Sequence, residues 1–460
     1  MRTLLFGLVA VAALGGSARA DEPVKAPADP AAKGAYVVIV GVSDTADKTI
    51  LPRPSADADA KALFDLLTDK KYLDVAADRV VLLTSKADEK RKGAVATREA
   101  IVKAVHDAVA ATGKNDLLVL AFFGRGASAG DRTCLFASDT DFKERAKTGV
   151  LGSDLEPDLK AAKTQRVLLL MDVHFKGYDA GKESVIEPTL KEVIAALFGG
   201  EDKGEQPLPR DRVFMLGAVP AADPLQKGDH GLFASTVIDG LKGAADKDGY
   251  EADGVVTVDE LAKYLEKEMP EQARKLGKTA KEKESEPFLI GEQTSHFGVT
   301  KNPKESDTVD KRLKAVAKLE ADGKLGKEAA AEGTQLLARM PRLKALQELR
   351  KKYQSLADGT IRVDEFATAA DAIKKGMLLP EDDAAMFVKK VMTAANFVEV
   401  RYVKPTVKGE LVAGAVKGMF RRLEETLPTE LEEKLKGAKD WKKADMEDAQ
   451  IGRASCRERV

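Results

Sequence analysis

Five short apolar runs alternate with longer amphipathic segments over the first two thirds of the chain. Each run has the length and hydrophobicity of a buried strand; the runs are Tyr36–Gly41, Arg79–Leu83, Asp116–Phe123, Gln165–Met171 and Arg212–Gly217. Between them, apolar residues recur at helical spacing in Ala56–Leu67, Arg98–Ala111 and Ser153–Ala162. Strands that alternate with helices predict an α/β domain with a mostly parallel sheet, here over residues 34–300.

From about residue 301 the apolar positions follow helical spacing throughout. Residues 301–383 are rich in Ala, Lys, Glu and Leu, and residues 384–450 form a second helical segment. A proline disfavours helix at the residue before it, so we expect the domain junction at Asn302-Pro303. The chain is therefore predicted to be an α/β domain followed by an all-helical C-terminal region.

The N-terminus has the pattern of a secretory signal peptide over residues 1–20. Arg2 is followed by an apolar stretch from Leu4 to about Gly15, and then by Ala18 and Ala20, which fit the small-residue rule for cleavage. We therefore expect export to the periplasm or the cell exterior. The apolar stretch is too short to span a bilayer, and no later stretch reaches the length required, so no membrane span is expected.

The segments that border the folded regions have their own composition. Residues 21–33 are rich in Pro and Ala and predict a disordered lead-in. Residues 451–460 match one reading frame of a common sequencing adapter, so we interpret them as an artefact. We expect that the natural chain continues differently after Gln450.

The charge of the chain argues against a nucleic-acid partner, and its cysteine content excludes an intramolecular disulfide. The chain has 74 basic and 75 acidic residues, and the signal peptide and adapter-like tail hold five basic and one acidic of them, which leaves a net charge of −5. A nucleic-acid partner would favour a basic surplus, so none is expected. Cys134 is the one cysteine left, so no intramolecular disulfide can form.

Two of the strand ends carry candidate chemistry. Phe122-Phe-Gly-Arg-Gly126 follows one apolar run, and Met171-Asp-Val-His-Phe-Lys-Gly177 follows the next. In parallel sheets, sites form at the carboxyl ends of the strands. We therefore expect Arg125 and His174 to lie on neighbouring strand ends.

These segments resemble the caspase-like cysteine peptidases, above all the metacaspases, in which the strands end in Ser-Gly-His-Gly and Asp-Ala-Cys-His-Ser-Gly. The resemblance covers roughly residues 34–300. Ala35–Ala60 resembles the first strand of the family with its Leu-Pro-Gly and Asn-Asp-Ala motifs, and Asp116–Asp139 resembles the strand that carries the histidine and its continuation. Arg166–Asp172 resembles the strand before the nucleophile, and His230–Gly243 resembles the helix start with the His-Gly-Leu-Phe motif. The resemblance implies a three-layer caspase-like (caspase-hemoglobinase) domain.

In that family the histidine is the general base and the cysteine the nucleophile. Here Arg125 stands at the histidine position and His174 at the cysteine position. A guanidinium stays protonated and has no acceptor atom, so Arg125 cannot take a proton from a nucleophile. The resemblance therefore implies a peptidase domain without its catalytic pair, and we expect a pseudopeptidase that acts in binding or regulation.

The acid that precedes the lost cysteine is retained as Asp172. In metacaspases the equivalent residue lines the pocket for a substrate Arg or Lys, which implies a peptide or protein partner with basic residues. The alternative is that Asp172 neutralises Arg125 across the old cleft. The two interpretations have equal support from the sequence.

An active endopeptidase is the alternative function. Cys134 lies in a strand-like run and is interpreted as a small buried hydrophobic residue, and Ser128 has no base near it in sequence. The other route is a serine peptidase module after Gln450. Phe397–Pro405 and Gly409–Leu423 resemble the helical N-terminal segment of the C-terminal processing (tail-specific) serine peptidases, although a generic helix pair explains so short a match equally well.

Residues 246–260 are a candidate calcium site. Asp253 and Glu260 match the second half of an EF-hand loop at the correct offsets, whereas Asp246 and Asp248 supply the first half only if three residues loop out. We favour the alternative, an acidic turn that caps the helix beginning near Asp259. No other cofactor is expected.

Overall fold

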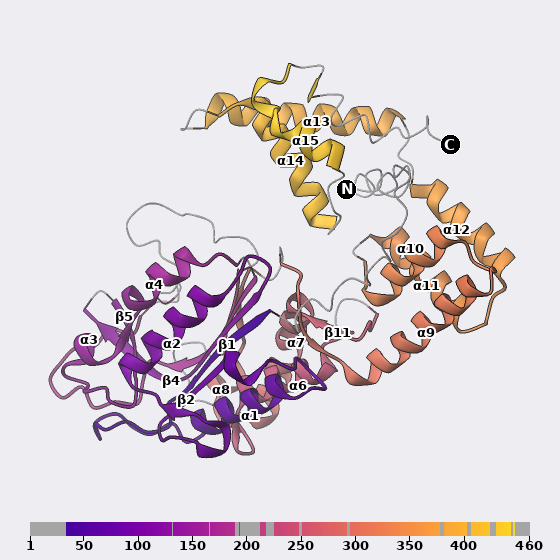
Figure 1. Cartoon of the computed structure of the whole chain (residues 1–460). Coiled ribbons are helices and arrows are strands. Elements are labelled where there is room, and N and C mark those ends of the chain that lie inside the picture. Colours follow the sequence, from indigo (N-terminus) through magenta and orange to yellow (C-terminus); the bar gives the residue numbers. More distant parts are fainter. Residues whose placement is uncertain are drawn as a thin grey trace. The chain divides into compact units, whose positions relative to one another are not determined.

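The computed structural model describes residues 34–130, 132–164, 166–188, 193, 212–217, 225–247, 251–291, 295–341, 343–377, 381–402, 406–423, 429–442 and 445–446. The chain divides into two compact units. One contains Ala28–Asp307, and the other contains Thr308–Val460. Figure 1 shows the strands in the first unit and helices alone in the second.

The first unit is built on a mostly parallel sheet. Its strand order is β12-β8-β7-β4-β1-β2-β3, and every neighbouring pair is parallel except β12, which runs antiparallel to β8. The bounds are β1 (Ala35–Gly41), β2 (Val80–Thr84), β3 (Ala94–Val95), β4 (Leu117–Ala129), β7 (Arg166–His174), β8 (Arg212–Leu216) and β12 (Phe288–Ile290).

Short strands extend or border this sheet. β5 (Arg132–Leu135) pairs antiparallel with the end of β4 and with β6 (Val150–Leu151). Two further antiparallel pairs join β9 (Gln226–Lys227) to β10 (His230–Gly231), and β11 (Val255–Thr257) to β13 (Gly298–Lys301). Turns of 3₁₀ or π-helix lie at Ala77–Arg79, Glu89–Arg91, Gly240–Ala244 and Ala438–Asp440.

Helices cover both faces of the sheet, because successive side chains of a strand point to opposite sides. Val37 and Ile39 of β1 belong to one buried cluster with α1 (Ala56–Thr68), α6 (Leu232–Asp239) and α7 (Val258–Leu276). Val38 and Val40 belong to a second cluster with α2 (Arg98–Ala111) and α4 (Gly152–Ala161). Two short helices, α3 (Arg145–Thr148) and α8 (Ala280–Lys283), complete the described part of the unit. The predicted three-layer arrangement is confirmed.

The helical region has two groups of helices, each with its own core. The first is α9 (Pro303–Ala321), α10 (Lys327–Ala338), α11 (Lys344–Ala357) and α12 (Val363–Met377), packed around Leu349, Tyr353 and Phe366. The second is α13 (Glu381–Arg401), α14 (Lys408–Leu423) and α15 (Thr429–Lys436). The predicted helical C-terminal region is confirmed, and among the described residues no helix is both long and apolar enough to cross a membrane.

The predicted strands differ from the observed ones mainly where they end. The apolar run at 116–123 stops well short of the end of β4 at Ala129, and the run at 165–171 stops short of the end of β7 at His174. Both extensions contain polar residues that are nevertheless buried, so hydrophobicity alone could not reveal them.

Candidate active site: the cleft at the ends of β4 and β7

Arg125 and His174 lie side by side on adjacent strands. Residue 125 of β4 is the register partner of residue 174 of β7, at the carboxyl end of the sheet. Both side chains are buried. The expected juxtaposition on neighbouring strand ends is therefore present, although both residues extend their strands instead of standing in loops.

The guanidinium of Arg125 binds backbone carbonyl groups. Its Nε donates to the oxygen of Leu51 at 2.8 Å, Nη1 to that of Lys176 at 2.7 Å, and Nη2 to that of Pro52 at 3.1 Å. Gly177 has a φ of +84°, and a Cβ there would lie 2.2 Å from Nη1 of Arg125. Arg125 therefore ties the loop after β1 to the loop after β7, and a glycine leaves the space for it.

Asp172 is neutralised by a residue that the sequence did not single out. Its Oδ2 accepts a hydrogen bond from Nη2 of Arg53 at 2.5 Å, and its backbone oxygen accepts one from Nη1 at the same distance. We expected either an acidic pocket or a pair with Arg125. The observed ion pair is with Arg53 instead, because the guanidinium of Arg125 is directed to the three carbonyl oxygens.

Electrostatics in the cleft follow from this pair. Burial raises the pKa of Asp172, but the charge of Arg53 and the nearby His174 outweigh burial and bring the pKa down to about 2. The Nε2 atom of His174 lies 3.2 Å from Oδ1 of Asp172. Asp172 is thus ionised at all physiological pH values, and Arg53 matches its charge.

A second carboxylate lies beside this pair. Asp59 of α1 is buried, its Oδ1 lies 2.9 Å from Nδ1 of His230, and it accepts a hydrogen bond from the backbone N–H of Gly231. A Cβ on Gly231 would lie 3.0 Å from Oδ2 of Asp59 and 3.1 Å from Oδ2 of Asp172. The two carboxylates therefore flank Gly231.

Burial raises the pKa of Asp59 to about 6, and the charge of Asp172 adds to the shift against the contrary effects of His230 and Arg53. We call these five residues the cleft cluster: Arg53, Asp59, Asp172, His174 and His230. The sequence alone did not point to Arg53 or Asp59, and it gave His230 only as the start of a segment that resembles the family. The available signal was that all three lie inside segments that matched the family motifs.

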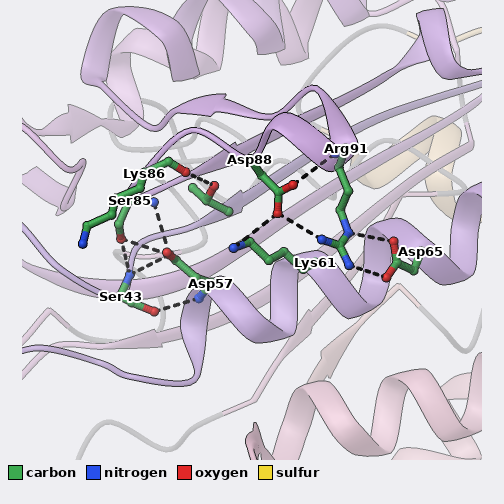
Figure 2. A network of polar contacts seen from close by, with 9 residues as sticks. Ser43, Asp57, Lys61, Asp65, Ser85, Lys86, Asp88 and Arg91 are labelled. Atoms are coloured by element: carbon green, nitrogen blue, oxygen red, sulfur yellow. Dashed lines mark hydrogen bonds and ion pairs between the residues drawn. The ribbon is translucent and has the colours of Figure 1, made fainter.

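A polar network joins Ser43, Asp57 and Ser85 (Figure 2). Oδ1 of Asp57 accepts hydrogen bonds from the backbone N–H of Ser43 and from both the N–H and the hydroxyl of Ser85. The backbone N–H of Arg53 in turn donates to the oxygen of Ser43 at 2.8 Å. The first turn of α1 thereby holds the ends of β1 and β2 together, next to the cleft cluster.

The two other candidate nucleophiles, Cys134 and Ser128, both make hydrogen bonds to backbone oxygens. Cys134 lies on β5, is fully buried, and has its Sγ 3.3 Å from the backbone oxygen of Arg145. Burial raises the pKa of its thiol to about 12, so it remains protonated and unreactive at neutral pH. The hydroxyl of Ser128 donates to the backbone oxygen of Ile186 at 2.5 Å.

The calcium candidates form an acidic turn. Asp246 accepts hydrogen bonds from the backbone N–H groups of Asp253 and Gly254, at 3.0 Å each, and from Nδ2 of Asn302 at 2.8 Å. Glu260 accepts from the N–H and hydroxyl of Thr257, which is the N-cap of α7. We call Asp246, Asp253 and Glu260 the acidic turn; Asp248 lies outside the described residues.

This geometry corresponds to helix capping, the alternative that we favoured. Burial raises the pKa of Asp246 to about 7 and that of Glu260 to about 9, and the charge of Asp253 contributes to both shifts. Within the described part of the chain, no three side chains of His, Cys, Asp or Glu are grouped as a metal site.

The sheet order and the two helical layers define a three-layer α/β domain, with Arg125 and His174 paired at the ends of β4 and β7. A family model described as the caspase domain matches residues 35–290, which is more than half of the chain. The chain therefore belongs to the caspase-domain family.

Several solved structures are similar to this chain at low sequence identity. The chain is similar to caspase-1 from Spodoptera frugiperda, with 12% identity and a TM-score of 0.36, over 61% of this chain and 96% of that one. It is also similar to a structural genomics target protein from Geobacter sulfurreducens, with 14% identity and a TM-score of 0.34, over 56% and 92%. No curated protein matches the chain.

Proposed function

We propose that this protein is an exported caspase-domain protein that binds polypeptide partners without hydrolysing them. The observation that carries the proposal is Arg125. It occupies the position of the general base, and its guanidinium donates to three backbone oxygens. A group that is permanently protonated and held in this way cannot accept a proton from a nucleophile.

The burial and the raised pKa of the Cys134 thiol support the same proposal. Nucleophilic catalysis of the family type requires a thiolate within hydrogen-bond reach of its base. Cys134 is buried on β5 with its pKa raised to about 12, and His174 occupies the nucleophile's position beside Asp172. The site therefore lacks the groups that hydrolysis of the family type requires.

The partner that we propose is a polypeptide whose binding does not depend on Asp172. A basic side chain would need an unmatched carboxylate, and Asp172 already has Arg53 at 2.5 Å. Leu51, by contrast, is an exposed apolar side chain on the loop that Arg125 clamps. A partner with a basic residue at this position would have to displace Arg53, so we expect it to bind no better than one with a neutral residue.

The test uses the full chain with fluorogenic peptides that have Arg or Lys before the scissile bond, and with a thiol-reactive probe. The native protein is expected to give neither product nor labelling. Labelling that Cys134→Ala abolishes would contradict the proposal, as would serine-probe labelling that Ser128→Ala abolishes.

A gain-of-function variant tests whether the backbone around the ends of β4 and β7 can still support catalysis. Arg125→His combined with His174→Cys places an imidazole and a thiol on adjacent strand ends, and we expect slow cleavage of the fluorogenic peptides. His174→Cys alone is the control, because it adds the thiol but retains the permanent cation. If the folded double variant is inert, the cleft has lost more than its catalytic pair.

Export rests on the N-terminal pattern that ends at Ala20. We expect the mature protein to begin at Asp21. N-terminal sequencing of protein recovered from outside the cytoplasm of a bacterial host checks this, and Ala20→Lys is expected to block cleavage. A full-length N-terminus on the exported protein would contradict it.

A further inference from the structure

Helix α13 has two apolar sides, and only one of them is covered by its own unit. Val388 and Ala395 are buried, and Ala395 shares a cluster with Val412 of α14 and with Met446. On the other side, the exposed fractions are 44% for Met386, 66% for Phe397 and 76% for Val400. Three large apolar residues on one helix are therefore presented to solvent.

The exposed side follows a heptad pattern. Met386, Thr393 and Val400 are seven residues apart, and Lys390 and Phe397 are also seven apart, four residues after Met386 and Thr393. Alternating steps of four and three are those of the a and d positions of a coiled coil. Since 21 residues at 1.5 Å each span about 30 Å, the helix offers a seam of three turns or more between Met386 and Val400.

The charge on this seam is positive at its centre. Lys389 and Lys390 are both exposed and lie between Met386 and Phe397. Among the described residues neither lysine has an acidic partner, whereas Glu399, further along the helix, pairs with Lys408 at 3.2 Å. Two exposed ammonium groups in the middle of an apolar stripe favour a partner with carboxylates opposite them.

We propose that the seam formed by Met386, Lys390, Thr393, Phe397 and Val400 binds an amphipathic helix of another protein, with apolar residues at its heptad positions and acidic residues facing Lys389 and Lys390. Phe397 is the expected anchor, because large aromatic residues dominate the energetics of such contacts. Figure 1 shows α13 as a long helix, and it packs against α14. This interaction does not involve the cleft, so it is independent of the function proposed above.

A second copy of the chain fits the seam less well. If two α13 helices paired antiparallel with Phe397 of one on Met386 of the other, Lys390 of each copy would come next to Lys390 of the other copy near the two-fold axis. Like charges that meet in an apolar seam are destabilising. An acidic helix removes that repulsion and adds opposite charges.

The experiment uses the full chain and two synthetic four-heptad peptides, both with Leu and Ile at the core positions. One has Glu at every flanking position and the other has Lys. In isothermal titration, the acidic peptide is expected to bind at least tenfold more tightly than the basic one. Phe397→Asp should weaken the binding at least tenfold, and Lys389→Glu with Lys390→Glu should reverse the preference.

The matched control is Ile186→Asp, because Ile186 is an equally exposed apolar residue (78%) in the other unit. It should leave the binding of the acidic peptide unchanged. Circular dichroism of each variant confirms that the helices remain.

Three outcomes would overturn the proposal. The first is equal binding of the two peptides, or binding that Phe397→Asp does not change. The second is a dimer in sedimentation that Phe397→Asp dissociates, which would assign the seam to a second copy. The third is binding of phosphatidylglycerol vesicles, but not of the acidic peptide, that the same variant abolishes, which would assign it to a lipid surface.

Discussion

The cleft cluster and the acidic turn both bury carboxylates in the first unit, but they stabilise them in different ways. In the cleft cluster a guanidinium lies on Asp172, and the pKa of that carboxyl is about 2. In the acidic turn the hydrogen bonds to Asp246 and Glu260 come from backbone N–H groups, an amide and a hydroxyl, and the pKa values rise to about 7 and about 9.

Burial raises the carboxyl pKa values of Asp172, Asp246 and Glu260 alike, so the difference between these pKa values comes from the groups that contact each carboxylate. An opposite charge within about 4 Å can overcome desolvation, whereas neutral donors compensate for it only in part. In the cleft cluster, the charge of Asp172 is matched by that of Arg53. The acidic turn instead has carboxyl groups that hold protons near neutral pH.

The largest expected effect comes from breaking the ion pair of the cleft. Arg53→Met leaves Asp172 buried without its cation, and we expect the free energy of unfolding at pH 7 to fall by about 3–5 kcal/mol. Arg53→Met combined with Asp172→Leu is the matched control, and it should recover most of the loss because no unpaired charge remains. Urea unfolding measures both. A loss under about 1 kcal/mol for Arg53→Met would show that the pair contributes little.

Arg125→Met tests a cation whose partners are neutral. It removes three charge-assisted hydrogen bonds to neutral carbonyl oxygens and leaves no buried unpaired charge behind, so we expect a smaller loss of about 2–3 kcal/mol. Arg132→Met, at an exposed arginine of the paired strand β5, should change stability by less than about 0.5 kcal/mol. Equal losses for the two variants would refute a structural role for Arg125.

Glu260→Gln tests the acidic turn. Unlike the two arginine substitutions, it should raise the free energy of unfolding. The pKa of the Glu260 carboxyl rises from an ordinary value of 4.5 to about 9 in the folded protein, so between these values the folded state holds a proton that the unfolded state has lost. The free energy of unfolding then decreases as the pH rises through that interval. Gln cannot ionise, so the variant should be more stable than the native protein at pH 8 by on the order of 2 kcal/mol.

Unfolding curves from pH 4 to pH 9 measure this difference, with and without added calcium. A calcium site would give the reverse result, since calcium would stabilise the native protein and Glu260→Gln would abolish that effect. A native stability that does not depend on pH in this range would contradict the raised pKa.

The smallest effect is expected within the cleft cluster itself. The pKa of Asp59 rises from 3.8 to about 6, so ionisation of Asp59 lowers stability as the pH rises from about 4 to 6. Asp172, whose pKa is lowered, gives the opposite slope between about pH 2 and pH 4. Asp59→Asn should remove the first slope and leave the second, as urea unfolding of both proteins between pH 2 and pH 7 would measure. Loss of both slopes would show that the two carboxyls titrate as one unit.

Much of the fold could be predicted from local patterns. The helix Arg98–Ala111 was predicted with its observed bounds, and the runs that became β1, β2 and β8 were predicted to within one residue at each end. A strand buried on both faces is uninterrupted in hydrophobicity, so these elements are visible in a single sequence. The polar extensions of β4 and β7 carry no such signal.

The sequence by itself determined the family, the layer architecture and the presence of Arg125 and His174 at two neighbouring strand ends, because each depends on residue types at positions close along the chain. Only the tertiary structure decided what those residues contact. Arg53 and Asp172 are 119 positions apart, and Asp59 and His230 are 171 apart. Parallel strand pairing and the return of α1 across the sheet bring them together, and no periodicity in the sequence records a contact made over that distance.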